Sequence, residues 1–238
     1  IPAFNEAHMH LLPYGLGLSQ VNLRAEEVRT LDELLRRVSE AAKAAPKGAW
    51  VLGRGYDHGE LDVGRHPLAE ELDAAVPDNP VFIVRTCGHV AIANTAALKL
   101  ASIGHNTPDP EGGVIVRKNG KLTGELQERA MQLVRKVIPA PDQTQMVNAI
   151  GAACERLASL GFASATDMNV GMVAGLAEID AYEAAKAQGR LLLRMWQVLA
   201  GNPEGIAQKA WEAGLRPMAG DDFLRWGAVK VFADGSAG

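Results

Sequence analysis

Apolar runs and amphipathic stretches alternate along most of the chain. Short apolar runs predict strands, and longer stretches in which apolar residues recur every three or four positions predict helices. The expected strands cover residues 4–8, 50–53, 162–166, 191–199 and 224–233. The expected helices cover residues 31–45, 142–160, 172–187 and 203–213. Strand and helix in repetition indicate parallel strands joined by crossover helices, as in a βα barrel or an open doubly wound sheet.

Local signals mark the ends of two of these helices. Thr30 precedes the helix at 31–45 with Glu33 three residues on, which is the capping-box pattern. Gly161 follows the helix at 142–160, at the position where a left-handed residue commonly ends a helix.

The stretch 66–136 interrupts this alternation. It contains an apolar, β-branched run at 80–85, a helical segment at 95–100 and a hairpin at 113–124. In the hairpin, Asn119-Gly120 supplies the two positive-φ residues of a tight turn. We therefore expect an inserted α+β lobe.

The expected fold class is α/β: the first half, about four strands, of a (β/α)8 TIM-type barrel with an inserted α+β lobe after the first strand. A complete barrel usually takes ~250 residues without insertions. The expected boundaries are 1–30 for the first barrel strand, 31–136 for the lobe and 137–238 for barrel units two to four. Because the chain opens on a strand and closes directly after one, we expect a fragment of a longer enzyme, with the remainder of the barrel missing.

Composition and charge narrow the class of partner. The chain has 238 residues, 47% of them hydrophobic and 22% charged, with a net charge of -4 and no block of Lys or Arg. This balance gives no electrostatic reason to expect nucleic acid or a membrane surface, so a small-molecule substrate is expected. Cys87 and Cys154 are too isolated for a disulfide framework, which fits a reducing compartment. The expected location is the cytoplasm.

Candidate chemistry lies at strand ends. A strand would place His8 and His10 on one face, as a chelating pair needs, and neutral imidazoles are the commonest protein ligands for zinc. The alternative is a terminal strand that happens to carry two histidines. Lys230 interrupts an apolar run, so its ammonium must be modified, paired with Asp234, or extended to the rim of the sheet. Asp167 follows a strand and either presents a functional carboxylate or caps the next helix.

Several segments, in the same order along the chain, resemble the metal-dependent amidohydrolase superfamily, and one branch of it, the amidohydrolase 3 or YtcJ-like group. The opening Pro2-Ala-Phe-Asn-Glu-Ala-His-Met-His resembles the motif PGFxDxHxH. The closing Gly227-Ala-Val-Lys-Val-Phe-Ala-Asp-Gly-Ser is similar to GAVKxFxDGS. Further similar segments are 50–57, 72–98, 112–115 and 123–128. Asn5-Glu6 departs from the pattern, which has an aspartate two residues before the first histidine.

The resemblance implies a metal centre. His8 and His10 would ligate the more buried of two metal sites, and Lys230, carboxylated by CO2, would bridge both metals. Zinc is the expected ion, with iron and manganese as alternatives, because imidazole and carboxylate suit all three. Two metals sharing a hydroxide would cleave a C–N bond of an amide or N-acyl small molecule.

The family's general acid/base aspartate and further histidines belong to later strands, so no catalytic residue is assigned in this chain, and the chain alone is expected to be inactive. The alternative is a non-catalytic or metal-free relative acting as a small-molecule binding or regulatory protein. If the chain is complete, a homodimer in which a second copy covers the open edges of a half barrel is a third hypothesis.

The expected substrate-binding residues are His89, Asp57, Tyr56 and Asp167. His89 has a locally bonded loop histidine as its alternative, and Asp57 has a turn or cap role. Tyr56 replaces the usual tryptophan of the resembling motif. Three further histidines are expected to be solvent-exposed, namely His58, His66 and His105.

Overall fold

The chain folds into two compact units in the computed structural model, which describes residues 2–201 and 205–232. The first unit comprises residues 1–19 and 140–238, and the second comprises residues 20–139. The sequence placed the lobe at 31–136. It begins earlier because strand β2 (Val21–Asn22) pairs with β3 (Val51–Tyr56), which anchors the segment after residue 19 to the lobe.

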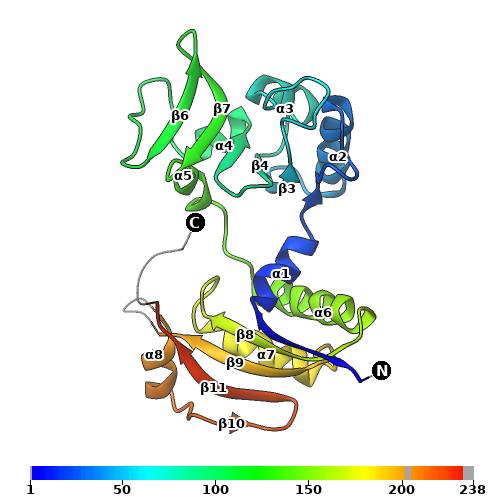
Figure 1. Cartoon of the computed structure of the whole chain (residues 1–238). Coiled ribbons are helices and arrows are strands. Elements are labelled where there is room, and N and C mark those ends of the chain that lie inside the picture. The colour runs from blue at the N-terminus through cyan, green and yellow to red at the C-terminus, as the bar shows by residue number, and fades with distance from the viewer. Residues whose placement is uncertain (1, 202–204, 233–238) are drawn as a thin grey trace. The chain divides into compact units, whose positions relative to one another are not determined.

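The first unit is built on one five-stranded sheet (Figure 1). Its strands, in sheet order, are β1 (Phe4–Met9), β8 (Phe162–Val170), β9 (Arg194–Ala200), β11 (Leu224–Lys230) and β10 (Ala219–Gly220). The pairs β1–β8, β8–β9 and β9–β11 are parallel, whereas β10 runs antiparallel to β11. The expected α/β class with parallel strands is confirmed. The carboxyl ends of the four parallel strands therefore meet at one edge of the sheet.

The helices of the first unit pack against the sheet and enclose one apolar core with it. They are α1 (Leu11–Leu18), α6 (Gln143–Ser159), α7 (Ala177–Ala187) and α8 (Ala207–Glu212). Helix α6 begins at Asp142, whose carboxylate accepts a hydrogen bond from Gln145 N–H while the Gln145 side chain accepts one from Asp142 N–H. It ends before Gly161, which has a φ of 90°.

Several elements of the first unit differ from the sequence-based expectation. Helix α1 was not expected. Helix α7 begins at Ala177 rather than 172, because residues 171–176 form a turn whose backbone N–H groups bind the Glu178 carboxylate. Strand β11 ends at Lys230, and the last expected strand residue, 233, lies outside the described residues, as do 203 and 204 of the expected helix 203–213.

The second unit is the expected α+β lobe. Its six-stranded sheet has the order β2, β3, β4 (Val81–Arg85), β5 (Val90–Ala93), β7 (Lys121–Glu128) and β6 (Gly113–Lys118). Its helices are α2 (Leu31–Ala44), α3 (Ala69–Ala75), α4 (Thr95–Leu100) and α5 (Met131–Arg135). The hairpin turn is confirmed, with φ of 50° at Asn119 and 77° at Gly120.

The expected capping box of α2 is half right. The Thr30 side chain accepts a hydrogen bond from Glu33 N–H, as expected. The Glu33 carboxylate does not return to the helix start, because it binds the guanidinium groups of Arg36 and Arg37 one turn further on. In the part of the chain that the structure describes, no helix is long and apolar enough to cross a membrane.

Candidate metal-binding site at the end of strand β1

The two histidines singled out in the sequence lie side by side at the carboxyl end of β1. Their ring centroids are 5.9 Å apart and their planes are nearly perpendicular, at 84°. The His8 side chain is exposed, and its backbone N–H binds the Glu6 carboxylate at 3.0 Å. His10 follows the strand and is the residue before α1, with 38% of its side chain exposed. Its Nδ1 is buried and has no hydrogen-bond partner among the described residues.

This donor set suits a metal ion only in part. Two neighbouring imidazoles whose ring nitrogens make no hydrogen bond to any described residue are chemically appropriate ligands for zinc and similar ions. Within residues 2–201 and 205–232, however, no cluster of three or more His, Cys, Asp or Glu side chains is arranged to hold a metal ion. The pair therefore fits as one part of a ligand set.

Asp167 lies directly beside this pair, on the neighbouring strand. It is the register partner of Met9 and is only 2% exposed. Its Oδ2 accepts hydrogen bonds from the Leu11 N–H at 3.1 Å and from the Tyr182 hydroxyl at 2.5 Å. Its Oδ1 accepts a longer bond from the Asn169 N–H, at 3.4 Å, and stands 3.9 Å from His10 Nδ1.

The surroundings of Asp167 contradict one of its expected roles. It does not cap the following helix, because α7 begins ten residues later and the donors that it binds lie elsewhere. Its carboxylate faces protein donors and leaves almost no surface for a substrate in this structure. Two residues next to Asp167 have buried side-chain atoms without a hydrogen-bond partner among the described residues. They are His10 and Gln197, and Gln197 is the register partner of Asp167 on β9.

Lys230 lies at the carboxyl end of β11, two strands beyond β8 in the same sheet. Its ammonium stands over the Phe232 ring, 5.0 Å from the centroid. No hydrogen bond or ion pair in the described part of the chain joins it to either histidine, and the alternative partner Asp234 lies outside the described residues. The structure therefore places Lys230 at the same sheet edge as the histidines without bringing them into contact.

In the lobe, Tyr56 and Asp57 belong to a group of interacting polar side chains. The fully buried Tyr56 shares a hydrogen bond of 3.0 Å with His66 Nδ1, and burial raises the pKa of its hydroxyl. The His66 ring stacks on His58, with centroids 4.1 Å apart. Arg85 donates to His58 Nδ1 at 3.1 Å and to Asp57 at 3.1 Å.

The expected exposure of two of these histidines is wrong. His66 keeps only 20% of its side chain exposed and His58 keeps 36%, whereas His105 is exposed as expected. Burial lowers the pKa of His66. The Asp57 carboxylate accepts a hydrogen bond from Gly59 N–H, and this bond lowers the pKa of Asp57. The hydrogen bond from Arg85 lowers the same pKa to a smaller extent. The turn role considered for Asp57 is thus present in the structure.

His89 is the most exposed of the expected substrate-binding residues, with 65% of its side chain accessible. Its Nδ1 lies 2.9 Å from a Glu128 carboxylate oxygen, and this hydrogen bond raises the pKa of the imidazole. The locally bonded alternative therefore describes its present contacts.

Two residues with clear roles in these contacts were missed in the sequence. Tyr182 is one tyrosine within an amphipathic helix, and only the fold shows that its hydroxyl reaches Asp167. Arg85 ends an apolar run, so a charged residue at a strand end was a signal that could have identified it.

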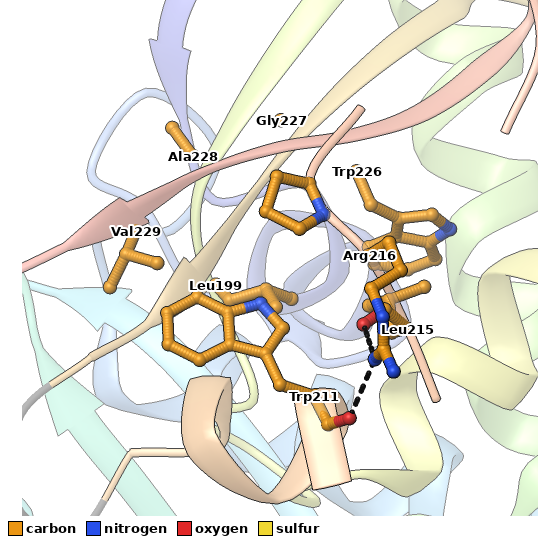
Figure 2. Close-up of a pocket in the computed structure, with 9 residues that line it drawn as sticks. Leu199, Trp211, Leu215, Arg216, Trp226, Gly227, Ala228 and Val229 are labelled. Atoms are coloured by element: carbon orange, nitrogen blue, oxygen red, sulfur yellow. Dashed lines mark hydrogen bonds between the residues drawn. The ribbon is translucent and has the colours of Figure 1, made fainter. Parts of the chain in front are cut away.

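A small pocket in the first unit is lined by residues other than the candidate site residues (Figure 2). Arg216 at its wall is already engaged, because it donates to the carbonyl oxygens of Trp211 and Leu215, both at 2.8 Å. The remaining lining is apolar, so the pocket offers no nucleophile or general base. Its lining residues are Leu199, Trp211, Leu215, Arg216, Pro217, Trp226, Gly227, Ala228 and Val229.

Comparison with known proteins places the chain in a family. Residues 1–238 match the amidohydrolase family. The putative amidohydrolase YtcJ of Bacillus subtilis (strain 168) is 32% identical over 239 residues, which is 100% of this chain and 44% of YtcJ. The N-substituted formamide deformylase of Arthrobacter pascens is 31% identical, covering 98% of this chain and 44% of the deformylase.

A solved structure agrees with these matches. An uncharacterized metal-dependent hydrolase from Pyrococcus horikoshii OT3 superposes with a TM-score of 0.74 and 32% identity, over 99% of this chain and 43% of that one. The chain thus spans less than half the length of the relatives that it matches. On the match over its whole length, the chain belongs to the amidohydrolase family.

Proposed function

We propose that this chain contributes the first half of the barrel and the first metal ligands of a metal-dependent hydrolase that cleaves a C–N bond in an amide or N-acyl small molecule. The observation that carries the proposal is the imidazole pair at the carboxyl end of β1, with a buried carboxylate behind it. The carboxyl ends of barrel strands are where enzymes of this architecture place their chemistry. The name of the Arthrobacter pascens relative, a formamide deformylase, supports the bond type.

The strand register supports a place for Lys230 in the same centre. Met9, Asp167 and Gln197 occupy one row across β1, β8 and β9. Lys230 pairs with Ala200, three positions beyond Gln197 on β9. In a closed eight-stranded barrel the register staggers by about one position per strand, hence by about three across three strands. The displacement of Lys230 along β9 has this size, which supports the proposal that Lys230 belongs to the same centre as the histidines.

In the proposed centre, His8 and His10 hold a divalent ion, zinc first among the candidates, and a carboxylated Lys230 completes the set with ligands from the rest of the protein. Such ions, when bound, polarise a carbonyl group and make water a stronger nucleophile near neutral pH. Among the lobe residues, His89 is the proposed substrate contact, because 65% of its side chain is accessible, whereas Tyr56 is fully buried and Asp57 is paired with Arg85.

A zinc titration of the purified 238-residue chain tests this proposal. We expect measurable but moderate binding, because this chain supplies only part of the ligand set, and we expect His8→Ala and His10→Ala each to weaken it severely, because each removes one of two imidazole ligands. His105→Ala, which removes an exposed lobe histidine, is the matched control and should bind zinc like the unaltered chain. Equal affinity in all four proteins would refute the assignment and favour a metal-free binding or regulatory relative.

A further inference from the structure

We infer that Asp167 and Tyr182 form a positioning pair that fixes the orientation of His10 for metal binding. This inference rests on the proposed function, because it assumes that His10 is a metal ligand. Neither residue would touch the metal or the substrate, and both would act through the imidazole.

Asp167 is tied to the backbone on both sides of His10. Met9, the preceding residue, is its register partner across the β1–β8 pair. Leu11, the following residue, donates its backbone N–H to the carboxylate. Leu11 is the first residue of α1, and the His10 side chain makes no capping hydrogen bond at that helix start. Asp167 therefore accepts one of the N–H groups that a helix leaves unpaired at its start, and this bond holds the backbone next to His10 in place.

Tyr182 in turn holds the carboxylate. Its side chain is completely buried, and its single hydroxyl proton goes to Asp167 Oδ2. The ring packs edge-on against Trp226, with centroids 6.3 Å apart and planes at 83°, which restricts its rotation. Oδ2 is thus engaged twice, by Leu11 and by Tyr182, and the orientation of the other oxygen is set by these bonds.

That other oxygen faces the imidazole. Oδ1 has one long bond to Asn169 N–H and stands 3.9 Å from His10 Nδ1, which has no partner among the described residues. A buried acceptor with spare capacity and a buried nitrogen without a partner are complementary, although 3.9 Å exceeds hydrogen-bond length. A shift of about 1 Å would close the contact, since N–H···O bonds measure roughly 2.9 Å.

Closing this contact has a chemical consequence at the ring. A proton on Nδ1, donated to Asp167, leaves the Nε2 lone pair free for a metal ion. Metal-bound histidines usually donate their second ring N–H to a carboxylate, backbone carbonyl or water in this way. Loss of such an outer partner typically costs about 10–100-fold in metal affinity.

Zinc titration calorimetry on the 238-residue chain tests the inference, with thermal unfolding of each metal-free protein recorded in parallel. We expect Tyr182→Phe to weaken zinc binding about 10-fold and Asp167→Asn to weaken it by up to about 100-fold. Thr95→Val is the matched control: it removes another hydroxyl that donates to a carboxylate, that of Asp73, but in the lobe, and should leave zinc affinity unchanged.

A second readout is the ring tautomer. Nitrogen-15 NMR of metal-free protein should show His10 mainly protonated on Nδ1, and Tyr182→Phe should reduce that population. A purely structural role for the pair predicts a lower melting temperature with unchanged zinc affinity and tautomer, which would overturn the inference. If Asp167→Asn does not fold, Tyr182→Phe decides the matter.

The design separates the two proposals. If His10→Ala binds zinc as well as the unaltered chain does, the proposed function fails. If His10→Ala abolishes binding while Tyr182→Phe and Asp167→Asn retain full affinity, only the positioning role fails.

Discussion

His66 and His89 show how surroundings set the protonation of one residue type in opposite directions. Burial lowers the pKa of His66, whereas a hydrogen bond to Glu128 raises that of His89. The ordinary histidine pKa is about 6.5, which is the reference for the unfolded chain. Lowering the pH therefore changes the free energy of unfolding in opposite directions through these two residues.

For His66, acid should destabilise the folded protein. Below about pH 6.5 the unfolded chain takes up a proton that the folded chain resists, so stability falls as the pH drops towards the lowered folded pKa. The groups around the ring are Tyr56, His58, Arg85 and Glu125. We expect urea unfolding of His66→Gln to depend less on pH between about 6.5 and 5 than that of the unaltered chain.

His89→Gln provides the contrast for that experiment. The raised pKa of His89 gives stability that is present below about pH 6.5 and is lost as the pH rises through the folded value. This substitution should therefore remove a stabilising effect of mild acid. An unchanged acid profile in His66→Gln would contradict the assigned burial effect.

Residue exposure was the least predictable property of the sequence. His58 and His66 lie in Gly- and Pro-rich loops. No local sequence pattern indicates that Arg85 will bind His58 or that Tyr56 will bind His66. The His8 and His10 pair could be predicted because strand alternation is local. The role of Tyr182 could not, since it depends on a contact with a strand residue fifteen positions earlier.

At the scale of elements, the pairing of α1 with α6 depends on a glycine. A Cβ on Gly15 would lie 2.0 Å from the Ala149 carbonyl oxygen, which is far inside van der Waals contact. Backbone atoms of α6 cannot rotate away as a side chain could. The small residue at this position therefore permits the close approach of the two helices.

Gly15→Ala should destabilise the first unit by about 1–3 kcal/mol, the usual cost of overpacking. Chemical denaturation followed by tryptophan fluorescence measures the change. Gly104→Ala is the control, because the nearest atom to its added Cβ would be the Thr107 hydroxyl at 3.9 Å. A Gly15→Ala protein as stable as the control would show that α1 shifts freely on α6.

Strands were easier to predict than helix starts. The four parallel strands were predicted from short apolar runs, although β1 is mostly exposed, and α6 was predicted from its cap and its terminal glycine. Helix α1 escaped prediction because it contains Pro13 and two glycines and is held at its start by Asp167, which lies far away in the sequence. Helix α7 begins later than expected because the Glu178 carboxylate binds N–H groups of the turn that precedes the helix.

At the scale of the whole molecule, the two units have separate hydrophobic cores. One cluster of buried side chains combines α1 with residues 146–226, and two further clusters lie entirely within residues 23–134. Among the described residues, none of these buried clusters draws members from both units. Cooperative unfolding follows shared burial, so each unit is expected to open as its own cooperative structure.

Native-state hydrogen exchange tests this independence directly. Gly15→Ala strains only the first core, so it should speed exchange of the slowest amides in β8 and β9 while those in β3 and β4 keep their rates. Leu72→Ala, which removes a fully buried side chain from a lobe cluster, should have the reverse effect. Acceleration of both sheets by either substitution would mean that the units unfold together, and the lobe would then have to be treated as part of the structure that supports His8 and His10.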